Sequence, residues 1–265
     1  MTKSQKELAF LRDLTVTKDW TDRFTNFIDK HIKLPKQGNF LYFNAGTLSH
    51  ALELREKLED DVNLVCVCDD AELKLISEAK STAMKAKIKF NELKELESES
   101  FDEVLADLSF VRPDNISEIV DELVYLTKKG GKISFFLPTA GSFGEIFSYL
   151  WETFLDIDLV EKSAEIENLI SEIPSVSDTE AIAKEAGLKS IESEISNEVF
   201  EYETGKDFIS STLLSDFLFP VWLKFLGEKE RKKAIQKMAQ LIDNEADKLS
   251  FRFSVKATLV EGIKK

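Results

Sequence analysis

The sequence predicts an α/β fold built on a doubly wound, mostly parallel sheet of seven strands with helices on both faces. Short apolar runs alternate with segments of helical periodicity from residue 40 to residue 137. The run NLVCVC at residues 63–68 is almost continuously apolar, as expected of a parallel strand that is buried on both faces. A turn containing Gly46 joins the first apolar run to the first helix of the alternation. Alternation of this kind predicts parallel strands joined by right-handed crossovers.

The order of elements indicates a helical extension at the N-terminus and helical insertions after the core. Residues 1–34 carry apolar side chains at helical spacing, and Pro35 and Gly38 end that pattern. Strands are expected at residues 40–44, 63–68, 87–90, 101–108, 132–137, 188–199 and 251–263. Helices are expected at residues 47–58, 71–84, 113–126, 143–154, 177–186, 207–226 and 228–247.

Several element ends carry local signals. Pro113 suits the first turn of a helix, and Gly130-Gly131 stops that helix before the fifth strand. Ser177 and Glu180 have the spacing of a capping box, which would begin the helix that ends before Gly187. No internal repeat or low-complexity linker separates these elements.

One domain over residues 1–265 is the simplest organisation that these elements allow. Residues 1–38 would form the N-terminal helical layer, and residues 39–140 the ligand-binding core. Residues 141–265 would form a C-terminal half with a helical lid and the last two strands. The length also permits two small domains.

Composition and charge limit the classes of function. The sequence has 265 residues, a formal net charge of −14 and 43% hydrophobic residues, as in a soluble globular protein. Nucleic-acid binding needs clustered lysine and arginine, whereas these residues are mixed with acids almost everywhere. The negative charge suits a cationic small ligand. The expected partners are a small molecule or a protein, and nucleic acid is not among them; the oligomeric state is left open.

Neither a signal peptide nor a membrane segment is expected. The N-terminal stretch MTKSQKELAFLRDL has no uninterrupted apolar core and no cleavage pattern. The longest apolar stretch, residues 217–226, contains Pro220 and Lys224 and is too short to cross a bilayer. The expected location is the cytoplasm.

The cysteines and histidines predict no metal site and no disulfide. Cys66 and Cys68 lie two residues apart on an expected strand, where an extended backbone gives poor disulfide geometry. A metal would need further ligands, and His31 and His50 are the only histidines. Buried thiols in a reducing cytoplasm are the favoured interpretation.

Segments along most of residues 35–265 resemble motifs of the class I S-adenosylmethionine-dependent methyltransferases, in the order of that family. LYFNAGTLSHAL aligns without gaps with the family's first motif, commonly LDVGCGTG, and the helix after it. The later matches are CVCDDAELKLISEAK, FNELKEL, SFDEVLADLSFV, LTKKGGKISFFLPT, EAGLKSIESE and TLVEGIKK. The resemblance implies a Rossmann-like fold and S-adenosylmethionine as the cofactor.

The resemblance also implies where the methionine and ribose parts of that donor bind. Asn44, Ala45 and Gly46 form the turn that would face the methionine end, where free backbone N–H groups can bind a carboxylate. Asp69, or its neighbour Asp70, is placed at a strand end to accept hydrogen bonds from the ribose hydroxyls. Two acids suit a ligand whose sulfonium makes it net positive.

Further positions follow from the same resemblance. Glu92 falls where the family has an acid near the adenine, and Leu93 would flank the ring. Asp107 and Ser109 lie beyond the fourth strand, in the region that faces the transferred methyl group. No catalytic residue is assigned, because the donor is already activated and alignment of the reacting atoms is the main requirement.

Three positions depart from the family's pattern. Asn44 replaces a glycine, although asparagine tolerates a left-handed turn. Leu48 replaces another glycine and would add a branched side chain where the ligand should lie. Tyr42 replaces the family's acid.

Structural explanations compete with these ligand roles. Asp69 could be a helix N-cap, and Glu92 could be a solvated loop charge. His50 is expected on the surface or half-buried, and Tyr42 is expected in the core.

Two functions follow from the sequence. The first is methyl transfer from S-adenosylmethionine to a small-molecule or carrier-bound acceptor, with helices at about 141–186 and 205–250 forming the acceptor pocket and lid. The alternative is a catalytically inactive methyltransferase-like scaffold that has lost its donor site. A nicotinamide dehydrogenase is disfavoured because the spacing G-x-G-x-x-G is absent.

Overall fold

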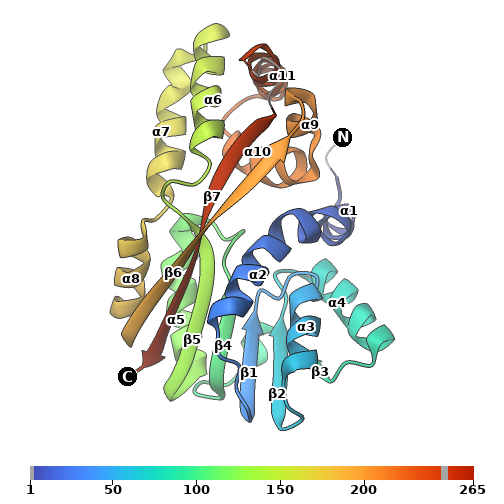
Figure 1. The fold of residues 1–265 in the computed structure, drawn as a ribbon, viewed down its shortest axis with the longest axis vertical. Helices are drawn as coiled ribbons and strands as arrows, with labels where there is room; N and C mark the ends of the chain where they lie inside the picture. The colour runs from blue at the N-terminus through green and yellow to red at the C-terminus, as the bar shows by residue number, and fades with distance from the viewer. Residues whose placement is uncertain (1–2, 246–249) are drawn as a thin grey trace. The chain divides into compact units, whose positions relative to one another are not determined.

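The computed structural model describes residues 3–245 and 250–265 and contains one seven-stranded sheet (Figure 1). The strands are ordered β3-β2-β1-β4-β5-β7-β6. Their bounds are β1 Gly38–Phe43, β2 Val62–Val67, β3 Ile88–Phe90, β4 Phe101–Asp107, β5 Thr127–Thr139, β6 Leu188–Tyr202 and β7 Phe251–Lys264. The five strands from β3 to β5 pair in parallel. The predicted α/β fold with a mostly parallel seven-stranded sheet is confirmed.

The described chain divides into two compact units. Unit 1 comprises Met1–Leu137, Ser175–Ser196 and Ala257–Lys265, and unit 2 comprises Pro138–Pro174 and Asn197–Lys256. The first boundary lies close to residue 140, where the sequence predicts the end of the ligand-binding core. The single-domain organisation stays a prediction.

Unit 1 holds the parallel strands and the helices that cover them. Its helices are α1 Gln5–Leu11, the π-helix η1 Arg12–Thr21, α2 Asp22–His31, α3 Ser49–Lys57, α4 Ala71–Met84, α5 Ile116–Leu126 and α8 Val176–Glu185. Side chains of α5 and α8 pack with one face of the sheet in a cluster that includes Val120, Ala183 and Phe135. The next residue on β5, Phe136, points to the other face and contacts Phe24 of α2, with ring centroids 6.0 Å apart.

The strand register determines which residues meet at the carboxyl edge of the sheet. Phe43, the last residue of β1, lies between Val67 of β2 and Ala106 of β4. All three strands run in the same direction, so the segments that follow them emerge side by side. Asn44, Asp69 and Asp107 are therefore neighbours at one edge, which is where open α/β sheets bind ligands.

Two predicted element ends are wrong. The capping residue of α8 lies two residues earlier than predicted, because Ser175 and Asp178 form the capping box and Ser177 lies inside the first turn. Strand β5 begins at Thr127, before Gly130-Gly131, which the sequence analysis took as a helix stop. Gly130 has a φ of +75°, and the pairing of β4 with β5 shifts register here, as in a β-bulge.

Unit 2 consists mostly of helices, together with the end of β6 and the start of β7. Its longer helices are α6 Gly144–Asp156, α7 Ser163–Glu172, α9 Gly205–Ser210 and α11 Glu228–Glu245, and between α9 and α11 lie the π-helix η5 Leu213–Leu218 and α10 Phe219–Trp222. Helix α7 was missed, although Ile166, Leu169 and Ile170 have helical spacing in the acidic stretch before Pro174. The predicted end of α11 at residue 247 lies outside the described residues.

An aromatic cluster forms the core of unit 2. Phe200 and Phe253 stack with ring centroids 4.8 Å apart, and Phe208 contacts Phe251 edge-on at 4.7 Å. Within residues 3–245 and 250–265, no helix combines the length and the hydrophobicity needed to cross a membrane. The cytoplasmic location, and the acceptor pocket expected from these helices, stay predictions.

Candidate functional site

The turn after β1 has the left-handed backbone that its sequence predicts. Asn44 and Gly46 both have a φ of +55°, which asparagine and glycine tolerate better than other residues. The N–H of Ala45 donates to the carbonyl of Val67 at 2.9 Å and ties the turn to β2. The side-chain amide of Asn44 donates to the carbonyl of Asp107 at 3.2 Å and ties it to β4. The turn is thus fixed to both neighbouring strands.

Leu48 has a third left-handed conformation, with a φ of +72°, and is the N-cap residue of α3. Its side chain is fully buried in the core. Leu48 is not among the residues that line the small cavity beside the turn, and the effect of its side chain on ligand binding stays a prediction.

The two adjacent acids after β2 have different partners. Asp70 is the N-cap of α4, and its carboxylate accepts from the N–H of Leu73 at 2.9 Å. Asp69 does not cap the helix, so the N-cap explanation applies to its neighbour. The Asp69 carboxylate instead accepts from the Nη1 of Arg12 at 2.5 Å. Of the two, Asp69 is the acid that faces the Gly46 turn across this guanidinium.

Asp107 is buried where β4 ends. Its carboxylate accepts from the N–H of Ser109 at 2.8 Å, and its side chain lines the cavity. Burial raises the pKa of Asp107 to about 6, although the nearby charge of Arg12 and hydrogen bonds from Ser109 act to lower it. A carboxylate with this pKa is ionised at neutral pH and attracts cations.

Glu92 and Leu93 do not line this cavity. Glu92 is exposed, forms an ion pair with Lys94 at 2.7 Å, and precedes the short 3₁₀-helix Leu93–Glu95. The hydrogen bond and charge of Lys94 lower the pKa of Glu92. Leu93 is partly buried and packs against the core cluster of unit 1. The adenine-side role of these two residues stays a prediction.

The π-helix η1 covers the turn from the N-terminal side. Besides its bond to Asp69, Arg12 places its guanidinium carbon 4.9 Å from the ring centroid of Phe110. The hydroxyls of Thr17 and Thr47 are 3.0 Å apart, and the indole N–H of Trp20 donates to the hydroxyl of Ser109 at 3.0 Å. This segment therefore contacts the ends of β1, β2 and β4.

Sequence reasoning missed Arg12 as a site residue. A signal exists, because Arg12, Val16, Trp20 and Phe24 are spaced by four and all four are buried. A single arginine in line with a buried apolar stripe predicts a buried acidic partner, since an unpaired internal cation is costly.

A hydrogen-bonded chain of side chains lies beneath the cavity. The Tyr42 hydroxyl is 2.8 Å from His50 Nδ1, and His50 Nε2 is 3.1 Å from the carboxylate of Asp29, which also pairs with Lys57. Tyr42 is in the core, as predicted, and burial raises its pKa well above the ordinary value. His50 is buried rather than exposed or half-buried, because these two partners satisfy both of its ring nitrogens.

The cavity at this edge is very small. Its volume is about 10 Å³, and Arg12, Tyr42, Gly46, His50 and Asp107 are among the residues that line it. That space holds about one water molecule, whereas sites for drug-sized ligands have a few hundred Å³. A nucleoside fits only if a lining residue moves.

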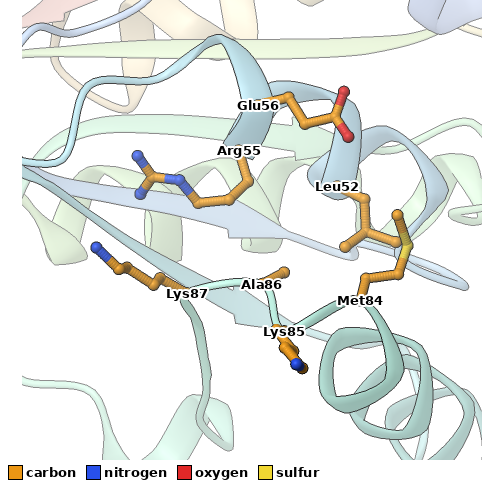
Figure 2. A pocket seen from close by; sticks show the side chains of 7 residues that line it. All are labelled: Leu52, Arg55, Glu56, Met84, Lys85, Ala86 and Lys87. Carbon is orange, nitrogen blue, oxygen red and sulfur yellow. The ribbon is translucent and has the colours of Figure 1, made fainter.

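A larger hollow of about 180 Å³ lies at the opposite, amino edge of the strands (Figure 2). Figure 2 shows Leu52 and Met84 next to each other on one side and the heads of Arg55 and Lys87 on the other. The guanidinium of Arg55 donates to the carbonyls of residues 58, 59 and 62, and Lys87 pairs with Asp60 at 2.8 Å. These cations stabilise the end of α3 and the start of β2.

The sequence matches no protein-family model. It matches no curated protein either. Solved structures, however, share its fold at low identity.

A methyltransferase structure from Bacillus halodurans, described as putative, superposes with a TM-score of 0.59 at 14% identity, covering 91% of this chain and 98% of that chain. The YcgJ protein of Bacillus subtilis superposes with a TM-score of 0.57 at 14% identity, covering 92% of this chain and 98% of that chain.

A third structure is the phosphoethanolamine N-methyltransferase 2 of Haemonchus contortus in complex with phosphomonomethylethanolamine and S-adenosylhomocysteine. It superposes with a TM-score of 0.56 at 12% identity. That match covers 98% of this chain but 57% of the nematode chain, so this chain spans little more than half of it. These matches confirm the class I S-adenosylmethionine-dependent methyltransferase fold.

Proposed function

We propose that this protein binds S-adenosylmethionine and transfers its methyl group to a small-molecule or carrier-bound acceptor. The observation that supports this most is the position of three groups at one edge of a methyltransferase fold. The Gly46 turn and Asp69 follow β1 and β2, and Asp107 is the last residue of β4; these three strands lie side by side.

The chemistry of these groups fits such a donor. Two carboxylates, Asp69 and Asp107, suit a ligand that carries a diol and a net positive charge. A Cβ at Gly46 would lie only 3.3 Å from the guanidinium of Arg12, so the turn faces the space that this guanidinium fills. The volume fits only once Arg12 leaves this position, which is a condition of the proposal.

The protein's part in the reaction would be positioning. The bound donor supplies an activated methyl group on a sulfonium. In our proposal Asp69 holds the ribose, the turn of residues 44–46 holds the methionine end, and Asp107 lies near the positive charge. Alignment of acceptor and methyl group, with exclusion of water, then supplies most of the rate enhancement.

A second candidate is a scaffold protein that has this fold and no donor site. The cavity of about 10 Å³ and the replacement of the family's acid by Tyr42 favour it. None of the comparisons supports it. Acceptor identity is outside both proposals.

Titration of the purified protein with S-adenosylhomocysteine by calorimetry separates the two candidates. The enzyme proposal predicts saturable binding of one nucleoside per chain, with NAD at the same concentration as a control that does not bind. A folded protein that shows no heat at millimolar S-adenosylhomocysteine would leave the scaffold as the better proposal.

A further inference from the structure

We propose that the π-helix η1, Arg12–Thr21, is an intramolecular gate whose Arg12 occupies the crevice that the nucleoside needs. This proposal rests on the function proposed above and names a regulation of the same site. The donor would bind only to molecules in which Arg12 has left Asp69, so the position of this segment would set the apparent affinity.

The first argument is that Arg12 already has the partners expected of the ligand. Its guanidinium is planar and cationic, bonds the Asp69 carboxylate at 2.5 Å and lies over the ring of Phe110 at 4.9 Å. It also lies close to Gly46 and to the charge of Asp107. A delocalised cation held between two carboxylates and an aromatic ring is a chemical substitute for a cationic nucleoside.

The second argument is space. Arg12 has 9% of its side chain exposed, and the cavity beside it has about 10 Å³. The other groups that line the cavity belong largely to β1 and the turn, which are tied to β2 by backbone hydrogen bonds, and to α3, which directly follows the turn. Arg12 and Thr17 are held there by side-chain contacts. Withdrawal of the N-terminal segment is therefore the least costly way to open the crevice.

The third argument is that the two ends of η1 are held differently. At its C-terminal end Trp20 is fully buried and packs against Phe24, with ring centroids 5.0 Å apart. Val16 is also buried, but the contacts nearest the N-terminal end include two ion pairs, Arg12 with Asp69 and Asp13 with Lys80. Ion pairs can exchange with a charged ligand, whereas a buried indole cannot. The hinge would lie between Thr17 and Trp20.

The π-helical geometry supports movement at this place. π-helical turns are rare, usually a single turn long, and frequent at functional sites. Here ten residues from Arg12 to Thr21 are π-helical, between the α-helices α1 and α2. A rearrangement to α-helical bonding would shift Arg12 relative to Trp20 without unfolding the segment.

The gate makes a quantitative prediction, because a closed majority lowers the apparent affinity by the open fraction. We compare S-adenosylhomocysteine binding by calorimetry in the wild type and in Arg12→Met, which keeps an apolar stem and removes the cation. The variant should bind about tenfold more tightly if about a tenth of wild-type molecules are open. Lys18→Met is the matched control: it removes an exposed cation from the same π-helix and should bind like the wild type.

Hydrogen exchange on the wild type tests the gate without any substitution. Addition of S-adenosylhomocysteine should speed exchange at the amides of residues 12–17 and slow it at the amides of residues 44–48. Slower exchange in both segments would overturn the gate, because the N-terminal segment would then close over the ligand. This measurement also decides the matter if Arg12→Met, with Asp69 and Asp107 left unpaired, does not fold.

The outcomes separate the gate from the proposed function. If the wild type binds and Arg12→Met binds equally or more weakly, the gate is wrong and the proposed function stands, with Arg12 as a ligand contact in the weaker case. If both proteins are folded by circular dichroism and neither binds, the donor site itself is wrong, and the gate with it.

Discussion

The crevice beside Gly46 and the hollow beside Arg55 differ in size, position and charge, and the smaller one is the better candidate site. The crevice beside Gly46 has about 10 Å³ and lies at the carboxyl edge of the sheet. The hollow beside Arg55 has about 180 Å³ and lies at the amino edge (Figure 2). Ligands of open α/β sheets bind at the carboxyl edge, so position outweighs volume here.

The arginines of the two hollows differ in the groups to which they donate hydrogen bonds. Arg55 donates to backbone carbonyls at 2.7 Å and 2.9 Å, and a ligand cannot replace those acceptors without opening the helix end. Arg12 donates to the carboxylate of Asp69, a group that also accepts from ligands. An arginine with backbone partners is structural, whereas an arginine paired with a strand-end acid is exchangeable.

The largest effect is expected from Leu48→Gly at the rim of the small crevice. Loss of a fully buried leucine, partly offset by relief of its left-handed backbone, should lower the free energy of unfolding by about 3 kcal/mol. S-adenosylhomocysteine affinity should not change, because Thr47 and Ser49 line the cavity but Leu48 between them is buried in the core. Urea denaturation and calorimetry measure the two quantities. A clear gain in affinity would show that Leu48, and not Arg12, blocks the crevice.

The next effect concerns Asp69, tested in the Arg12→Met background so that the ion pair does not contribute. Asp69→Asn should weaken S-adenosylhomocysteine binding about 30-fold, because charge-assisted hydrogen bonds to the ribose are lost. Asp70→Asn makes the same change of charge one residue away and keeps an N-cap side chain. In the Arg12→Met background this control should bind S-adenosylhomocysteine as tightly as Arg12→Met alone. Equal losses in both variants would indicate general electrostatics and no specific contact.

Asp107→Asn should change how stability depends on pH. The folded pKa of about 6 lies above the ordinary value of 3.8, so the folded state takes up a proton first as the pH falls. Burial of the ionised carboxylate costs stability above pH 6, and acidification relieves that cost between about pH 6 and pH 4. The variant should therefore be about 3 kcal/mol more stable than the wild type at pH 8, with little difference at pH 4. Thermal melting at both pH values measures this, and a gap that widens on acidification would contradict it.

The smallest effect is expected at the larger hollow. Arg55→Met should cost about 1 kcal/mol of stability through the lost carbonyl contacts and leave nucleoside binding unchanged. Lys85→Met, in the same hollow, is the control and should change stability by less than about 0.5 kcal/mol. A loss of S-adenosylhomocysteine affinity in Arg55→Met alone would reverse the comparison and make the larger hollow the site.

Local signals explain what could be predicted from the sequence. The apolar run of β1, the glycine turn and the periodic apolar residues of α3 follow one another directly in the sequence. The signals for α4 are equally local, and both of its ends were predicted to the residue. The acids Asp69 and Asp107 follow apolar runs directly, so their place at the carboxyl edge could be inferred from strand direction.

What could not be predicted depends on contacts between distant residues. Arg12 and Asp69 are 57 positions apart, and nothing near either residue indicates the other. The choice of Ser175 over Ser177 as a cap, and of Asp70 over Asp69, is a competition between adjacent groups of similar propensity. The burial of Leu48 depends on how α3 packs. The fact that a leucine replaces the family's glycine at this position does not reveal that packing.

The π-helical form of Arg12–Thr21 has a consequence for how this crevice can change between related chains. A π-helix has more residues per turn than the 3.6 of an α-helix. In the gate proposed above, loss of one residue between Arg12 and Trp20 would favour α-helical bonding and shift the arginine relative to the indole. Such a deletion would change how far Arg12 fills the crevice, with no substitution at the acids or the turn.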